Sequence, residues 1–185
     1  MTIPSTRLSN RCILVVILLA LSLPALASSL QDRLQALDFE LPRERLPAPA
    51  FSLPTLNGGR LQLDDYRGQP VLLHFWATFC TSCREEMPVL AALAERFGKH
   101  GLAVLAVDVD RGSRRQVERF MEDLGVQLDV PLDPDGQVRR SYEIDTLPTT
   151  YLIGRDGRFL ARSIGPRDWG NAAVGELFEQ LTAVR

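Results

Sequence analysis

Residues 71–83 of the chain read VLLHFWATFCTSC, a stretch in which a strand pattern passes directly into a helix pattern. Its first seven residues form a nearly unbroken apolar run, with His74 as the one polar interruption. Such a run is typical of a central β-strand that is buried on both faces. After it, apolar residues recur at helical spacing up to about Phe97. Cys80 and Cys83 are therefore expected one helical turn apart, at the start of a helix that follows a buried strand.

The rest of the chain alternates strand and helix patterns. After the first helix we expect a buried strand, an amphipathic helix, a short helix, two antiparallel strands joined by a tight turn, and a closing helix. Their predicted ranges are, in that order, 102–109, 113–124, the residues around 138–142, 150–153 with 159–164, and 171–183. A hairpin of 51–53 with 61–63 is expected before them. This order predicts an α/β fold with a mixed central sheet flanked by helices, an N-terminal hairpin extension and a right-handed crossover.

The N-terminus has the pattern of a secretory signal peptide. Arg7 and Arg11 precede an apolar run over residues 12–23, and small residues follow it. The run is shorter than the ~20 residues of a membrane-spanning helix, but extension through Ala27 leaves an uncleaved anchor as the alternative. Further along, leucines at helical spacing and then three prolines indicate a short helix and a spacer. The predicted parts are a signal peptide or anchor at 1–27, a linker with a short helix at 28–49, and the domain at 50–185.

Composition narrows the classes of function. The chain has 185 residues, a formal net charge of −2 and no basic block, so nucleic acid is not an expected partner. Three cysteines are too few for a disulfide-scaffolded fold, and Cys12 lies in the segment that a signal peptidase would remove. In an exported protein the remaining pair, Cys80 and Cys83, would stand alone in an oxidising compartment. The pair is therefore a candidate redox site.

The start of a helix gives the two thiols different expected roles. Free backbone N–H groups and the positive end of the helix dipole favour a thiolate at the outer Cys80, which would attack a partner disulfide. Cys83, in the first turn, would then resolve the mixed disulfide.

Other functions of a cysteine pair fit the sequence less well. A zinc site needs about four ligands, and only His74 and His100 are available besides the pair. A c-type haem site requires histidine directly after the second cysteine, where Arg84 stands. A peroxiredoxin would carry threonine three residues before its nucleophile, but Ala77 has that place relative to Cys80. A purely structural disulfide stays open, although so short a loop constrains the unfolded chain little. We therefore expect no metal and no cofactor other than a redox-active disulfide.

The residues around the pair resemble the TlpA/ResA-like thioredoxin-fold thiol-disulfide oxidoreductases. These are exported or membrane-tethered proteins that include the cytochrome c maturation reductases. The resemblance covers roughly residues 47–185 and rests on FWAT at 75–78, before the cysteine pair, and on REEMP at 84–88 after it. It implies a thioredoxin-like fold in which Trp76 precedes the dithiol and Pro88 kinks the active-site helix.

The resemblance also implies further site residues. It assigns Glu86, three residues after the second cysteine, as the acid that tunes proton transfer to the thiols, and that spacing places it on the same helix face. The alternative, a carboxylate favoured by the helix start, describes neighbouring Glu85 better. The resemblance further implies a cis bond between Leu147 and Pro148 that faces the dithiol. A turn proline entering a strand is also where a cis peptide is usually found.

Two residues depart from the family pattern. Phe79 stands where most members have tryptophan before the first cysteine, which removes an indole N–H but keeps an apolar side chain there. His74 stands where thioredoxins have a buried aspartate and TlpA-like proteins commonly have asparagine. A buried imidazole near Cys83 is either a proton acceptor or a neutral, hydrogen-bonded core residue, and we favour the second interpretation.

The predicted function is an exported thiol-disulfide oxidoreductase of the periplasm or cell envelope that reduces specific partner disulfides through Cys80 and Cys83. The resemblance implies clients such as apocytochrome c or a copper-assembly protein, and a membrane electron donor of the DsbD/CcdA type. Membrane contact is expected only if the N-terminal segment is retained. One alternative is a DsbA-like oxidase, although residues 102–147 leave too little room for its helical insertion. The other is a thioredoxin-fold binding module with a vestigial dithiol.

Overall fold

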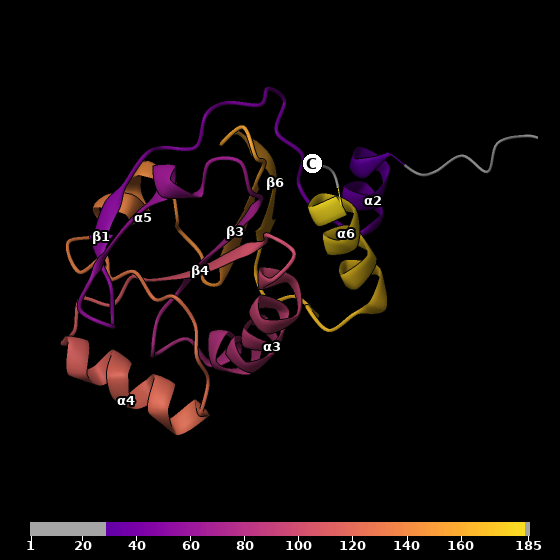
Figure 1. The fold of residues 1–185 in the computed structure, drawn as a ribbon. Helices are drawn as coiled ribbons and strands as arrows, with labels where there is room; N and C mark the ends of the chain where they lie inside the picture. Colours follow the sequence, from indigo (N-terminus) through magenta and orange to yellow (C-terminus); the bar gives the residue numbers. More distant parts are fainter. Residues whose placement is uncertain (1–28, 184–185) are drawn as a thin grey trace, which may run out of the picture.

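The computed structural model describes residues 29–183 and has a four-stranded mixed sheet at its centre (Figure 1). The strand order is β4-β3-β5-β6. β3 (Val71–Trp76) runs parallel to β4 (Ala103–Asp108) and antiparallel to β5 (Thr149–Ile153). β5 pairs antiparallel with β6 (Phe159–Ile164). The expected mixed sheet with a closing antiparallel pair is therefore confirmed.

The other elements follow in the expected order around this sheet, with η1 as an addition that was not predicted. They are α2 (Leu30–Ala36), β1 (Ser52–Pro54), β2 (Arg60–Gln62), η1 (Leu63–Tyr66), α3 (Thr81–Gly98), α4 (Arg114–Leu124), α5 (Gln137–Ser141) and α6 (Ala172–Ala183). β1 and β2 form the expected antiparallel hairpin. α4 ends at Gly125, whose φ of 63° is left-handed and carries no Cβ penalty in glycine. Element ends differ only slightly from the prediction, because capping rather than apolar periodicity determines them.

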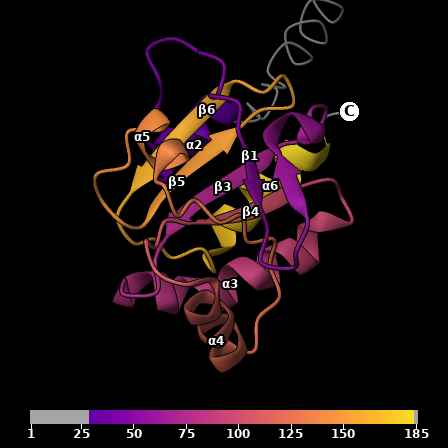
Figure 2. The same cartoon turned by 90° about the vertical axis from the view of Figure 1, so that its left-hand side faces the viewer.

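The two faces of the sheet bury different sets of side chains. Along β3, Leu72, His74 and Trp76 point to one face and the residues between them to the other, because side chains alternate along a strand. Helices α2, α3, α4 and α6 cover the first face, and the β1–β2 hairpin and α5 lie over the second. In Figure 2, α3 and α4 lie on the side of the sheet away from β1 and α5. β3 is buried throughout, as its apolar run predicts, so packing on both faces fixes the point where the cysteines follow.

The N-terminal segment lies against the domain. α2 is the expected short helix, and it lies beside α6 (Figure 1). Leu34 and Phe39 are only 1% and 5% exposed, in the same apolar cluster as α6. Glu40 pairs with Arg162 of β6 through a β-bridge and an ion pair. The described part of 28–49 is therefore not the separate spacer that we expected, because its apolar side has a partner near the other end of the chain.

The predicted signal segment at 1–27 lies outside the described residues, and it stays a prediction. Within residues 29–183, no helix combines the length and the apolar character needed to cross a bilayer.

Candidate active site

The two cysteines occupy the junction between β3 and α3. Cys80 is the N-cap of α3, and its Sγ accepts a hydrogen bond from the backbone N–H of Cys83 at 3.2 Å. The two residues form a disulfide with their Cα atoms 5.2 Å apart. Cys80 is 9% exposed, whereas Cys83 is fully buried. Only the outer sulfur can therefore be approached from solvent.

An open hollow of about 590 Å³ lies beside the outer cysteine. Its lining comes from the start of α3 and from the segment that precedes β5, and consists of Phe79, Cys80, Thr81, Ser82, Glu85, Arg139, Asp145 and Leu147. Phe79 is 73% exposed, which is unusual for so large an apolar side chain. The peptide bond between Leu147 and Pro148 is cis, as the family resemblance implies. The disulfide is thus bordered by an exposed aromatic ring and by the loop that carries the cis bond.

Glu86 lies one turn after Cys83 on the buried side of α3 and is 5% exposed. Its Oε1 accepts a hydrogen bond at 2.5 Å from the backbone N–H of Arg167, in the loop between β6 and α6. Burial raises the pKa of the Glu86 carboxyl to about 7, and the Arg167 N–H opposes that rise. Near neutral pH the carboxyl can therefore both accept and release a proton, which is what a proton-transfer residue requires.

His74 is fully buried on β3 and directly opposite Thr150 of β5. Its Nδ1 lies 2.9 Å from Oγ1 of Thr150, and its Nε2 lies 3.7 Å from Oε2 of Glu86. Burial lowers the pKa of His74 to about 3, so the ring is neutral at physiological pH. The structure supports the neutral, hydrogen-bonded interpretation of His74, and it adds Glu86 as a neighbour that the sequence did not predict.

Trp76 and Pro88 lie away from the hollow. Trp76 is buried, donates from Nε1 to the carbonyl oxygen of Ala106 on β4 at 3.1 Å, and has its ring centre 4.8 Å from that of Phe120 on α4. Pro88 lies inside α3, and the helix continues past it. Trp76 therefore anchors the end of β3 to its neighbours rather than lining the hollow.

Two buried aspartates, Asp108 and Asp110, lie at the carboxyl end of β4, and Asp110 supports the cysteine loop. Oδ2 of Asp110 accepts a hydrogen bond at 2.8 Å from the backbone N–H of Thr78, two residues before Cys80. Burial, reinforced by the neighbouring Asp110, raises the pKa of Asp108 to about 8. No motif marks these residues. Their place after a strand parallel to β3 is the signal that could have found them, because the ends of neighbouring parallel strands meet at one edge of a sheet.

Arg167 connects the loop that contacts Glu86 with the N-terminal segment. Its guanidinium lies 4.0 Å from the centre of the Phe39 ring and donates to the carbonyl oxygens of Leu37 and Asp38. No sequence pattern marks Arg167, because it is a loop residue whose partners lie about 130 positions earlier in the chain.

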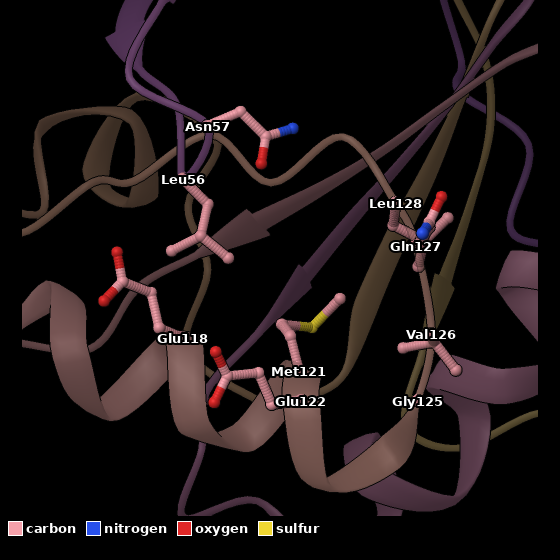
Figure 3. Close-up of a pocket in the computed structure, with 9 residues that line it drawn as sticks. All are labelled: Leu56, Asn57, Glu118, Met121, Glu122, Gly125, Val126, Gln127 and Leu128. Atoms are coloured by element: carbon pink, nitrogen blue, oxygen red, sulfur yellow. The ribbon is translucent and has the colours of Figure 1, made fainter.

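A larger hollow, of about 680 Å³, lies between α4 and the segments 56–57 and 125–128 (Figure 3). Met121 points into it from α4, and Glu118 and Glu122 stand beside Met121 on the same helix. No cysteine or histidine lines this hollow, so it offers no group for thiol chemistry. Within the part of the chain that the structure describes, no three His, Cys, Asp or Glu side chains gather as a metal site.

Known proteins with similar sequences and structures agree with the observed fold. A sequence profile of the AhpC/TSA family matches residues 45–161, which contain the disulfide and most of the sheet. The chain belongs to the AhpC/TSA family. It is 40% identical over 111 residues to the thiol-disulfide oxidoreductase ResA of Bacillus subtilis (strain 168), an alignment that covers 60% of this chain and 62% of that protein. This match therefore spans less than two thirds of the length of that ResA.

A second ResA, from a strain of Bacillus cereus, is similar over most of both chains. The two are 30% identical over 156 residues, which cover 84% of this chain and 89% of that one. A crystal structure from Chlorobium tepidum, described as a candidate thiol:disulfide interchange protein DsbE, superposes with a TM-score of 0.69 at 29% identity. That match covers 75% of this chain and 97% of the other. The thioredoxin-like fold and the resemblance to ResA-type proteins, both predicted from the cysteine motif, are confirmed.

Proposed function

We propose that this protein is a thiol-disulfide oxidoreductase whose exchanging group is the pair Cys80 and Cys83. The observation that carries the proposal is the disulfide at the N-terminus of α3, with one sulfur beside an open hollow and the other buried. The helix start stabilises a thiolate at Cys80, which makes it the nucleophile, and Cys83 is the resolving thiol. The similarity to proteins named thiol-disulfide oxidoreductase supports the assignment.

The reaction begins when the Cys80 thiolate of the reduced protein attacks one sulfur of a partner disulfide. The partner S–S bond breaks, a mixed disulfide forms, and the partner sulfur that leaves takes up a proton from water. Cys83 then gives its proton to Glu86 and attacks Sγ of Cys80. The bond between Cys80 and Cys83 forms, and the second partner sulfur leaves and is protonated. The partner is thereby reduced by two electrons, and the dithiol of this protein is oxidised.

The neighbouring residues support this cycle in separate ways. Glu86 lies one turn from Cys83 with its carboxyl pKa raised to about 7, so it is suited to accept and return the proton. Leu147 and Pro148 form the loop beside Cys80, where Pro148 would align the backbone of the partner. The exposed ring of Phe79 would give the partner an apolar contact next to the reacting sulfur.

We propose that the protein works as a reductant of specific partner disulfides. As the family resemblance implies, clients of cytochrome c maturation or copper-protein assembly are the candidates, and a membrane donor of the DsbD/CcdA type would restore the dithiol. Export to the periplasm or cell envelope would follow from residues 1–27, as a cleaved signal peptide or a retained anchor. In that compartment a dithiol without an electron donor would become oxidised, so a donor is part of the proposal.

The reduction potential tests the direction of the reaction. Equilibration of the purified protein with glutathione should give a value nearer to thioredoxin, at about −270 mV, than to DsbA, at about −120 mV. A value near that of DsbA would contradict the reductant and favour the disulfide oxidase.

A trapping experiment tests whether the pair exchanges at all. Cys83→Ser in the native host should accumulate mixed disulfides with exported proteins, because the resolving thiol is absent. The matched control with both cysteines replaced should accumulate none. A lack of adducts, together with a wild-type protein that reduces no disulfide, would favour the binding module with a vestigial dithiol.

A further inference from the structure

On the face of the sheet behind the disulfide, Ser163 of β6 is buried beside Thr150 and accepts a hydrogen bond from Nε of Arg167. Three further polar side chains are buried between the sheet and α3. They are His74 on β3, Thr150 on β5 and Glu86 on α3, each at most 5% exposed. Nε2 of His74 and Oε2 of Glu86 lie 3.7 Å apart, and neither atom has a hydrogen-bond partner within the described residues. Buried polar atoms are nearly always paired, and hydrogen bonds of reactive groups are often long in a resting structure, so these two atoms are candidate partners for each other.

The Thr150 hydroxyl determines which ring nitrogen of His74 carries the proton. Thr150 is 2% exposed, and in the part of the chain that the structure describes its hydroxyl has one hydrogen-bond partner, Nδ1 of His74, at 2.9 Å. A buried hydroxyl needs an acceptor for its own proton, so Thr150 donates to Nδ1. The neutral ring then carries its proton on Nε2, which points toward Glu86.

We propose that His74, held in this tautomer by Thr150, is a positioning residue that donates its Nε2–H to Glu86 and so keeps the Glu86 carboxylate available to accept the proton of Cys83. The proposal rests on the proposed function, because the proton moves from Sγ of Cys83 to the Glu86 carboxyl and later returns. No proton leaves the ring in either step, and the imidazole stays neutral throughout.

The charged groups around the pair are few. From the loop between β6 and α6, Arg167 faces Glu86 with its backbone N–H and its positive charge, both of which favour the carboxylate. On α3, Cys83 lies one turn before Glu86 and titrates only when the disulfide is reduced. Burial is the cause of the lowered pKa of His74, to about 3, and it keeps the ring neutral beside Glu86. The buried N–H of Trp169 lies outside hydrogen-bond geometry but still lowers the pKa of Glu86, so Trp169 is the rival donor.

Three substitutions of His74 separate the two sides of the ring. His74→Leu removes both polar contacts. The amide of His74→Gln reaches the place of Nε2 and can still donate to Glu86, whereas the amide of His74→Asn reaches only the place of Nδ1. His74→Leu and His74→Asn should raise the titration midpoint of the Glu86 carboxyl by about one to two pH units. His74→Gln should keep the midpoint close to its wild-type value. The measurement is the carboxyl ¹³C shift against pH in the oxidised protein, assigned with Glu86→Gln.

Two controls keep the result specific. Trp169→Phe removes the rival donor and should move the midpoint less than His74→Leu does. His100→Gln replaces the second histidine, which is exposed, and should leave the Glu86 midpoint unchanged. The imidazole ¹⁵N signals that disappear in this variant belong to His100, so the remaining ones belong to His74. The His74 signals should show the ring protonated on Nε2 from pH 6 to 8. This measurement uses the native His74, so it does not depend on whether a His74 variant folds.

Several outcomes would overturn the proposal. They are an unmoved or lowered midpoint in folded His74→Leu, a full shift in Trp169→Phe alone, or a ring protonated on Nδ1. These readouts need no thiol exchange, so a wild-type protein that reduces no disulfide would remove the proposed function while the NMR results still report on the pair. If thiol-disulfide exchange occurs, His74→Leu should shift the pH dependence of its rate. Adding His74→Leu to a protein that already carries Glu86→Gln should cause no such shift.

Discussion

Cys80 provides the reacting sulfur, and the neighbouring Phe79 provides an apolar surface for a partner protein. The Cys80 side chain is nearly covered, whereas the ring beside it is almost three-quarters exposed. A partner protein that brings a disulfide to the sulfur therefore meets the aromatic side chain at the same time, and an aromatic contact at the centre of a binding surface contributes strongly to affinity. A small disulfide can reach the sulfur without that contact.

Phe79→Ala should therefore lower kcat/KM for a disulfide-containing protein by roughly five- to thirty-fold. The rate with oxidised glutathione should change much less. Leu46→Ala is the matched control, because Leu46 is also exposed, at 53%, but does not line the hollow beside the disulfide. Equal losses with both substrates would mean that Phe79 shapes the reactive sulfur rather than the partner contact.

Glu86 should leave a signature in the stability of the oxidised protein. Its folded-state pKa, raised to about 7, lies above the ordinary value of 4.5, so the folded state binds the proton more tightly than the unfolded state. The favourable contribution is thus present below pH 4.5 and is lost as the pH rises through 7. Relative to Glu86→Gln, the wild-type protein should lose about 2–3 kcal/mol of unfolding free energy between pH 5 and pH 8. Urea unfolding at the two pH values measures this, and a difference independent of pH would contradict it.

At the scale of elements, the loop between β3 and α3 depends on β4. Thr78 donates its backbone N–H to Asp110 and accepts a hydrogen bond from Gln116 of α4 on its side chain. The loop that presents Cys80 is therefore tied both to the end of the neighbouring parallel strand and to the helix that follows it.

Asp110→Ala should loosen this loop. The partly buried N–H of Thr78 would lose its acceptor, at a cost of about 1–3 kcal/mol, and amide hydrogen exchange at residues 78–79 should accelerate. Asp110→Asn keeps an oxygen acceptor and should protect the Thr78 amide nearly as well as the native side chain. Equal exchange in the two variants would show that another group holds the loop.

The elements show how far the sequence could lead. Local periodicity was sufficient to predict β3 and α3, because the pattern of a buried strand or of an amphipathic helix is complete within a few residues. The same periodicity predicted α2 but not its partner, since nothing in a leucine repeat specifies a helix near the other end of the chain. The contact of His74 with Glu86 depends on strand register and helix placement together, and local patterns contain neither.

At the scale of the whole molecule, the two ends of the described chain pack against each other. α2 lies against α6, and the side chain of Leu34 is 1% exposed between them. An ion pair between Arg33 and Glu176 joins the same two helices at the surface, where it adds little. The stability of this closure comes from the apolar contact.

Leu34→Ala should therefore lower the unfolding free energy by about 2–5 kcal/mol, because a buried cavity replaces the side chain. Leu46→Ala, at an exposed site, should change it by less than about 0.5 kcal/mol. Denaturant unfolding measures both. A small loss in Leu34→Ala would mean that the N-terminal segment separates from the domain in solution, as a spacer would.

The hydrogen bonds from Arg167 to the carbonyl oxygens of Leu37 and Asp38 limit how far the domain could extend from an N-terminal anchor. Because residues 30–41 are bound to the domain, a form that retained residues 1–27 in a bilayer would have almost no free chain between its anchor and its folded part. Such a protein could not sweep a wide volume for its clients. Its dithiol would stay within one domain's length of the membrane, and clients and electron donor would have to come to it there.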